Sequence, residues 1–232
     1  MKPLLIVLIV LSLLFIAAAP EDARYVSQRE AMVRLQIAAR GVTDPATLHA
    51  MGSVKRHLFV PDSFLADAYD DRPLPIGYGQ TISQPYIVAY MTEIIHPRRD
   101  HRILEIGAGS GYQAAILSEI VRKVYSIEII SELGNAARER LKKLGIRNAE
   151  VRIADGYDGW PEQAPFDAII VTAAAEYIPP PLLKQLKDGG RMVIPVGSPF
   201  FVQTLMLVEK KGGQITTSQL MPVRFVPLRR SP

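Results

Sequence analysis

The chain has 232 residues, 48% of them hydrophobic and 22% charged, and is long enough for one sizeable α/β domain plus a small addition. The net charge of +4 is mild and no long basic run occurs, so we expect no nucleic-acid partner. The absence of cysteine excludes a disulfide framework, a thiol nucleophile and a cysteine-ligated zinc site. Because the four histidines are scattered, we also expect no catalytic metal.

Residues 1–22 are predicted to be a separate apolar leader. Lys2 precedes an apolar run that ends at Ala19, which is typical of a signal peptide or a short membrane anchor. Pro20 would hinder cleavage after Ala19, and a mis-assigned start upstream of Met32 is a third interpretation. The basic residues that follow favour a cytoplasmic domain, with a periplasmic or membrane-anchored protein as the alternative. We expect membrane contact only through residues 4–19.

Residues 23–100 are predicted to form N-terminal helices and a loop that cap the core. Apolar spacing over Gln28–Arg40 predicts a helix, and Asp44-Pro45 predicts the N-cap and first turn of a second, short helix. The segment Val60–Gln84 is rich in Pro, Gly, Asp and Tyr, which predicts an ordered loop. Pro85–Ile95 then predicts a helix packed against a sheet.

Residues 101–232 alternate between strand and helix patterns and are predicted to form one catalytic domain with residues 23–100. This alternation predicts βαβ units and a mostly parallel sheet with helices on both faces. Ser131 is the expected N-cap of a helix that runs to Leu144, and Asp188-Gly189-Gly190 an expected turn. The expected strands are Ile103–Ile106, Lys123–Ile130, Ala149–Tyr157, Phe166–Thr172 and Arg191–Val196, followed by a hairpin of Gln203–Lys210 with a strand from Ile215.

The stretch ILEIGAGSGY at Ile103–Tyr112 predicts a cofactor site. A buried strand is followed by Gly107, Gly109 and Gly111, which let the backbone turn tightly and approach a ligand. The G-x-G-x-G spacing is one residue shorter than the dinucleotide fingerprint. A carboxylate on Glu105 would repel a pyrophosphate and favour a ligand with a positive centre, such as S-adenosylmethionine.

Two further acids follow at the ends of the next two predicted strands. Glu128 lies about 20 residues after Gly107, where an acid accepts the ribose hydroxyls of a bound nucleotide. Asp155 is placed to accept the adenine amino group, with the amide of Gly156 nearby. Each acid alone is equally compatible with a solvated strand end, but the ordered set predicts a nucleoside pocket.

The segment GYGQTISQPYIVAY, Gly77–Tyr90, lies directly before a predicted helix. Ser83 stands two residues before Pro85, and one interpretation is that it only caps that helix. The runs GQTISQPYIVA, LEIGAGSGYQ, PFDAIIVTAA, GGRMVIPVG and VRFVPL resemble the protein-L-isoaspartate O-methyltransferase family. The resemblance covers about Met32–Arg229 and implies a Rossmann-like class I S-adenosylmethionine-dependent methyltransferase.

The resemblance also implies roles for individual residues. In the family the serine of the TIS motif is the active-site residue, which here is Ser83. Two departures are Ala154, where the family often has glycine, and the leader. The residues implied to hold the substrate are Gln80, Thr81 and Ile82 in the loop and Arg224, Phe225, Val226 and Pro227 near the C-terminus.

The implied reaction methylates the free carboxylate of L-isoaspartyl residues in age-damaged proteins and peptides. The ester then closes to a succinimide that partly reopens to aspartate. A carboxylate with a pKa near ~4 is already ionised at neutral pH, so the reaction needs no general base. We expect the enzyme to act as a monomer.

Three alternatives stay open on the sequence. The first is a methyltransferase for another substrate, such as RNA or a small molecule, although Val171–Ala174 stands where an amino-group methyltransferase has an N-P-P-[YF] motif. The second is a nicotinamide enzyme. The third is an exported, non-catalytic protein that binds a nucleoside or damaged peptides.

Overall fold

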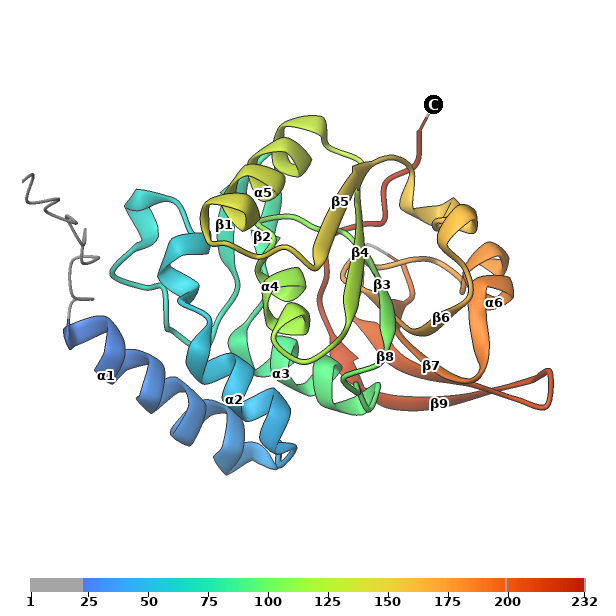
Figure 1. Ribbon diagram of the computed structural model, residues 1–232, viewed down its shortest axis with the longest axis horizontal. Helices are drawn as coiled ribbons and strands as arrows, with labels where there is room; N and C mark the ends of the chain where they lie inside the picture. The colour runs from blue at the N-terminus through green and yellow to red at the C-terminus, as the bar shows by residue number, and fades with distance from the viewer. Residues whose placement is uncertain (1–22, 199, 232) are drawn as a thin grey trace, which may run out of the picture.

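A twisted seven-stranded sheet forms the centre of the computed structural model, which describes residues 23–198 and 200–231 (Figure 1). The predicted leader lies outside the described residues. The strand order is β5-β4-β3-β6-β7-β8-β9, parallel from β5 to β7 and antiparallel from β7 to β9. The strands are β3 (Arg102–Ile106), β4 (Lys123–Glu128), β5 (Ala149–Ile153), β6 (Phe166–Val171), β7 (Leu186–Val196), β8 (Gln203–Lys211) and β9 (Gln214–Val223).

Helices cover both faces of this sheet, as the alternating pattern predicts. Figure 1 shows α4 and α5 on one side of the sheet and α6 on the other. Within β3, Ile103 packs into one apolar cluster and Leu104 into the other, so the strand is buried on both faces. The helices are α1 (Ala23–Ala31), α2 (Pro45–Ser53), α3 (Pro85–Ile94), α4 (Tyr112–Ser118), α5 (Ser131–Lys143) and α6 (Pro180–Gln185).

The N-terminal helices pack into the same apolar cluster as one face of the sheet. The predicted helix over Gln28–Arg40 is helical throughout, but α1 passes into a π-helical stretch, Met32–Ile37, and a short 3₁₀ turn. The predicted start of α2 is confirmed, because the carboxylate of Asp44 accepts a hydrogen bond from the Thr47 amide at 2.8 Å.

The prediction of a loop over Val60–Gln84 is only partly correct. This segment holds a short antiparallel hairpin, β1 (Leu74–Gly77) and β2 (Gln80–Ile82). Its turn is tight because Tyr78 has a positive φ of 54° between two glycines with positive φ. Strands of four and three residues are too short to produce an alternating pattern in the sequence.

Three other predicted boundaries are wrong. Ser131 is the first residue of α5 and its hydroxyl donates to Glu132, while Ile130 is the N-cap. The expected turn at Asp188-Gly189-Gly190 lies inside β7, where the ladder to β6 shifts register and Gly189 has a φ of 80°. The strand expected to reach Tyr157 ends at Ile153, so Asp155 lies beyond it.

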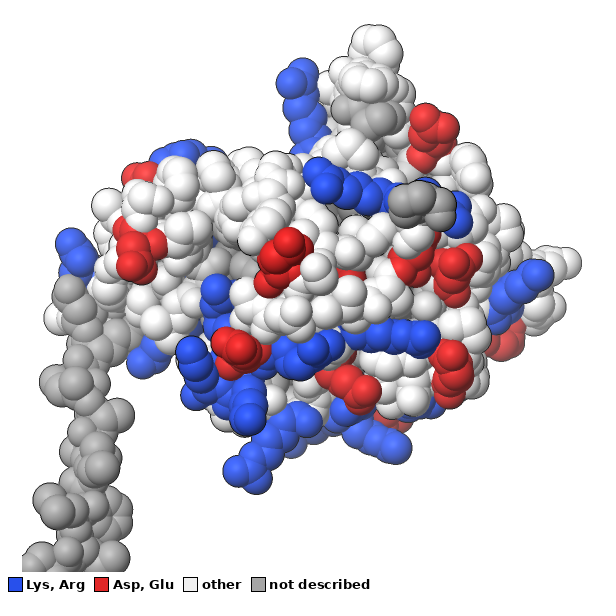
Figure 2. Space-filling view, turned by 90° about the horizontal axis from the view of Figure 1, so that it is seen from above, with Lys and Arg blue, Asp and Glu red and all other residues white. Residues whose placement is uncertain are grey.

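The surface carries charges of both signs. Figure 2 shows basic and acidic side chains interspersed over the face seen from above, in agreement with the mild net charge. Within residues 23–198 and 200–231, each helix is too short or too polar to cross a membrane.

Candidate active site

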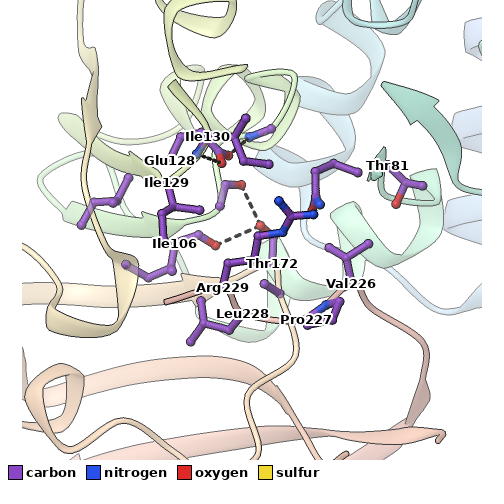
Figure 3. Close-up of a pocket in the computed structure, with 16 residues that line it drawn as sticks. Thr81, Ile106, Glu128, Ile129, Ile130, Thr172, Val226, Pro227, Leu228 and Arg229 are labelled. Carbon is purple, nitrogen blue, oxygen red and sulfur yellow. Dashed lines mark hydrogen bonds between the residues drawn. The ribbon is translucent and has the colours of Figure 1, made fainter. Parts of the chain in front are cut away.

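A cleft opens where β3, β4 and β6 end at the same edge of the sheet (Figure 3). We call it the donor cleft. Figure 3 shows Val226–Arg229 on the side of the cleft opposite Glu128 and Ile130. The lining residues are Gln80, Thr81, Ile106, Gly107, Gly109, Ile127, Glu128, Ile129, Ile130, Gly156, Thr172, Ala173, Val226, Pro227, Leu228 and Arg229.

Three of the residues that line the donor cleft are glycines, Gly107, Gly109 and Gly156. Gly107 has a φ of 98°, and a Cβ added there would collide with the hydroxyl of Thr172. A Cβ on Gly156 would collide with the side chain of Ile106. The Thr172 hydroxyl donates to the carbonyl oxygens of Ile106 and Gly107, at 2.9 and 2.7 Å, and so fixes the strand end against the glycine loop. Thr172 was missed as a site residue, since it looked like the last residue of an apolar strand.

Glu128, at the end of β4, accepts hydrogen bonds from the backbone of the glycine loop and of the segment after β4. One carboxylate oxygen accepts from the Gly109 amide at 2.8 Å and the other from the Ile130 amide at 2.9 Å (Figure 3). A carboxylate oxygen has two lone pairs, so both oxygens retain acceptor capacity. The predicted contact of Glu128 with ribose hydroxyls is therefore compatible with its position on the cleft wall.

Glu105 differs from its predicted role as a charged group. It is completely buried, and the Ser126 hydroxyl donates to its Oε2, while its Oε1 has no hydrogen-bond partner. Burial, with a smaller contribution from Glu128, raises the pKa of Glu105 from 4.5 to about 8. At neutral pH the group is thus mostly a neutral acid. It lines a small cavity between the glycine loop and Ser83, which we call the transfer cavity.

Asp155 lies beside the donor cleft but does not line it. Its Oδ1 accepts from the Tyr157 amide, and its Oδ2 accepts from the Arg230 side chain at 2.8 Å and the Ser231 amide at 2.9 Å. Partial burial acts to raise the pKa of Asp155, but these hydrogen bonds outweigh burial and lower it. The Arg230 guanidinium also lies 3.6 Å above the Tyr157 ring, so the C-terminal segment is held against Asp155.

Ser83 lies between the transfer cavity and a second groove of about 380 Å³, which we call the acceptor groove. The alternative interpretation, that Ser83 only caps α3, is wrong, because Gln84 is the N-cap of that helix and no side chain caps it. Thr81 lines both cavities as well, while Ile82 lines only the transfer cavity and Gln80 only the donor cleft. The acceptor groove is lined by Pro73, Thr81, Ser83, Gln84, Ile87, Thr172, Val202, Pro222, Val223, Arg224, Phe225 and Val226.

Arg56 is a buried contact of the Ser83 loop that sequence reasoning missed. It is 0% exposed, and its guanidinium donates to the carbonyl oxygens of Ala68 and Ser83, both at 2.8 Å. Its guanidinium carbon lies 4.9 Å from the centre of the Tyr112 ring, at the start of the helix after the glycine loop. Burial lowers the pKa of Arg56. A single arginine in VKRHLFV gives no sequence signal for this role.

Comparison with known proteins shows which family this chain belongs to. The model of the protein-L-isoaspartate(D-aspartate) O-methyltransferase family matches residues 27–231. The chain belongs to this family. It is 60% identical over 210 residues to protein-L-isoaspartate O-methyltransferase 1 of Nitrosospira multiformis, covering 89% of each chain. It is 58% identical over 213 residues to the enzyme of Opitutus terrae, covering 92% of this chain and 91% of the relative.

Solved structures of protein-L-isoaspartate O-methyltransferases share the fold. One has a TM-score of 0.79 at 31% identity over 86% of this chain and 65% of its own length. A putative enzyme from Plasmodium falciparum, in complex with S-adenosyl-L-homocysteine, has a TM-score of 0.75 at 26% identity, covering 89% of this chain and 99% of its own.

The predicted Rossmann-like class I methyltransferase fold and the methyl donor, S-adenosyl-L-methionine, are confirmed by the family. The three alternatives are thereby rejected. The donor cleft also fits such a ligand: Gly107, Gly109 and Gly156 line it without side chains, and Glu128 offers acceptors on one wall.

Proposed function

We propose that this isoaspartyl methyltransferase carries out methyl transfer in the transfer cavity, with Ser83 orienting the acceptor carboxylate. One observation carries the proposal: Ser83 lines both the acceptor groove and the cavity behind the glycine loop. The acceptor is the free carboxylate of an L-isoaspartyl residue in a damaged protein. Its methyl ester then closes to a succinimide without help from the enzyme.

The chemistry needs positioning more than proton transfer. The acceptor carboxylate has a pKa near ~4, so it is ionised at neutral pH and attacks without a general base. A hydrogen bond from the Ser83 hydroxyl would hold one oxygen and leave the other free to react. Holding the acceptor in line with the methyl group and excluding water supply most of the rate enhancement.

The donor cleft would hold S-adenosylmethionine, which when bound supplies an electrophilic methyl group on a sulfonium centre. We assign Glu128 to the ribose hydroxyls and Asp155 to the adenine amino group, with the Gly156 amide nearby. Of the predicted glycines, Gly107 and Gly109 line the donor cleft and would contact the donor, while Gly111 shapes the loop behind them. Glu105 is buried at the wall of the transfer cavity, where it acts on the site through the packing of the glycine loop.

Residues 23–100 and 101–232 act as one catalytic domain in this proposal. The support is a single apolar cluster that includes Met32 of the N-terminal region, Ala89 of α3 and Ile103 of β3. We place this domain in the cytosol, where the methyl donor is made, and expect it to work as a monomer. Protease protection of the full chain in intact and lysed cells tests the location.

The proposed function is tested with two peptides that differ only in an L-isoaspartyl or an aspartyl residue. We expect methyl transfer from labelled S-adenosylmethionine to the isoaspartyl peptide alone. Equal methylation of both peptides, or of neither, would overturn the proposal.

A further inference from the structure

Phe200, Phe201 and Val202 form an exposed apolar group in the connection between β7 and β8. Their exposed fractions are 90%, 75% and 52%, and the two phenylalanines are the most exposed large hydrophobic residues that the structure describes. Isolated exposed apolar side chains are common in proteins, but consecutive ones beside a groove are typical of a binding surface. We call these three residues the apolar rim.

The apolar rim continues into the acceptor groove. Val202 lines that groove together with Ser83, and the adjoining wall includes Ile87, Pro222 and Phe225. A ligand that reaches from Ser83 along the groove therefore meets apolar surface before it reaches solvent. The mixture of one polar end and an apolar mouth matches a peptide whose carboxylate lies at Ser83.

A buried glutamine fixes the rim relative to the predicted substrate-binding segment. Gln203 is 2% exposed, and its amide nitrogen donates to the carbonyl oxygens of Ser198 and Phe201, at 3.1 and 2.8 Å. Its side-chain oxygen accepts from the Phe225 amide at 2.9 Å. One side chain thus ties the rim to Arg224–Pro227, so the rim is a positioned part of the groove.

We propose that the apolar rim is a subsite for an apolar side chain that flanks the isoaspartyl residue of the substrate. This inference rests on the proposed function, because it assumes that the isoaspartyl carboxylate lies at Ser83. Ser83 and Val202 line the same groove, so residues that flank the isoaspartyl residue in an extended peptide lie along that groove. Folded proteins bury such side chains. The rim therefore selects segments that damage or unfolding has exposed.

The test uses the full chain and pairs of isoaspartyl peptides with either leucine or serine at each flanking position. We expect the leucine peptide to have a KM lower by about tenfold for at least one flanking position, from burial of its apolar surface. In the double variant Phe200→Ser/Phe201→Ser this difference should fall to within about twofold, with kcat unchanged. Leu35→Ser, which removes an exposed leucine outside both clefts, is the matched control and should retain the difference.

The outcomes separate this inference from the proposed function. If neither isoaspartyl peptide is methylated, the proposed function fails. If both are methylated with equal KM in the unmodified chain, or if the double variant keeps the difference, the subsite is wrong. A double variant that keeps the difference but no longer binds phosphatidylcholine–phosphatidylglycerol vesicles would show that the rim contacts membranes instead.

Discussion

The guanidinium of Arg56 donates a hydrogen bond of 2.8 Å to the backbone carbonyl oxygen of Ser83, 27 residues along the chain. The same guanidinium holds Ala68 and lies over Tyr112, next to the glycine loop. A single buried side chain therefore connects the segment that carries the acceptor serine with the helix that follows the donor loop.

Replacement of Arg56 by lysine is expected to lower kcat about tenfold, because an ammonium cannot hold both carbonyls in the geometry of a guanidinium. Calorimetric affinity for S-adenosylhomocysteine should change less than about twofold. The free energy of unfolding should also fall, by roughly 2–4 kcal/mol, from unsatisfied buried carbonyls.

Arg29→Lys is the control, since Arg29 is also buried and donates to the Gly52 carbonyl, away from Ser83. It should lower stability but leave kcat unchanged well below the melting temperature. If Arg29→Lys lowers kcat as much as Arg56→Lys at matched stability, Arg56 does not act through Ser83.

Ser83→Ala is expected to lower kcat on an isoaspartyl peptide by about 10- to 100-fold. The loss corresponds to one hydrogen bond to a buried charged group, roughly 1.5–3 kcal/mol. Affinity for the methyl donor should stay the same, and Ser53→Ala, at an exposed serine, should leave both quantities unchanged. Steady-state kinetics with full turnover by Ser83→Ala would refute the orienting role.

Burial of Glu105 should make stability depend on pH. Its folded pKa of about 8 lies above an ordinary 4.5, so the folded state binds more protons than the unfolded state between these values. The contribution of Glu105 to stability is therefore complete below about pH 4.5, falls as pH rises towards 8 and is constant above it. Glu105→Gln, which cannot ionise, should gain stability relative to the unmodified chain between pH 5 and 8.

Urea unfolding at several pH values, without the methyl donor, measures that difference. A stability difference between Glu105→Gln and the unmodified chain that does not change with pH would mean that Glu105 is ionised in the folded protein.

Asp155→Asn should weaken binding of the methyl donor about five- to tenfold, since the adenine amino group loses a charged acceptor. The KM for an isoaspartyl peptide should not change. Arg230→Gln removes the ion pair with Asp155 but leaves the carboxylate, so it should alter donor affinity less than about twofold. Equal losses in the two variants, measured by calorimetry, would show that Asp155 acts only by holding the C-terminal segment.

The sequence pattern predicts best what is local. The buried strand β3, the glycine turn after it and the position of Glu128 depend on residues close together in the chain, and the structure places them as expected. Long-range contacts have no such signal. The pairing of Asp155 with Arg230 spans 75 residues, and only the folded structure brings the two together.

The protonation of Glu105 could not be predicted for a related reason. From sequence alone a glutamate is expected to be ionised at neutral pH. Its pKa in the folded protein depends on its burial, which only the three-dimensional structure shows. The hairpin β1–β2 was not predicted, because its strands are too short to show an alternating pattern of apolar and polar residues.

The donor cleft includes Val226–Arg229, which follow β9 and so join the chain long after the glycine loop and β4. A nascent chain that already contains the glycine loop and β4 therefore still has an incomplete cleft. Ligand binding stabilises only a protein that can bind, so S-adenosylmethionine can assist folding only once Val226–Arg229 have left the ribosome.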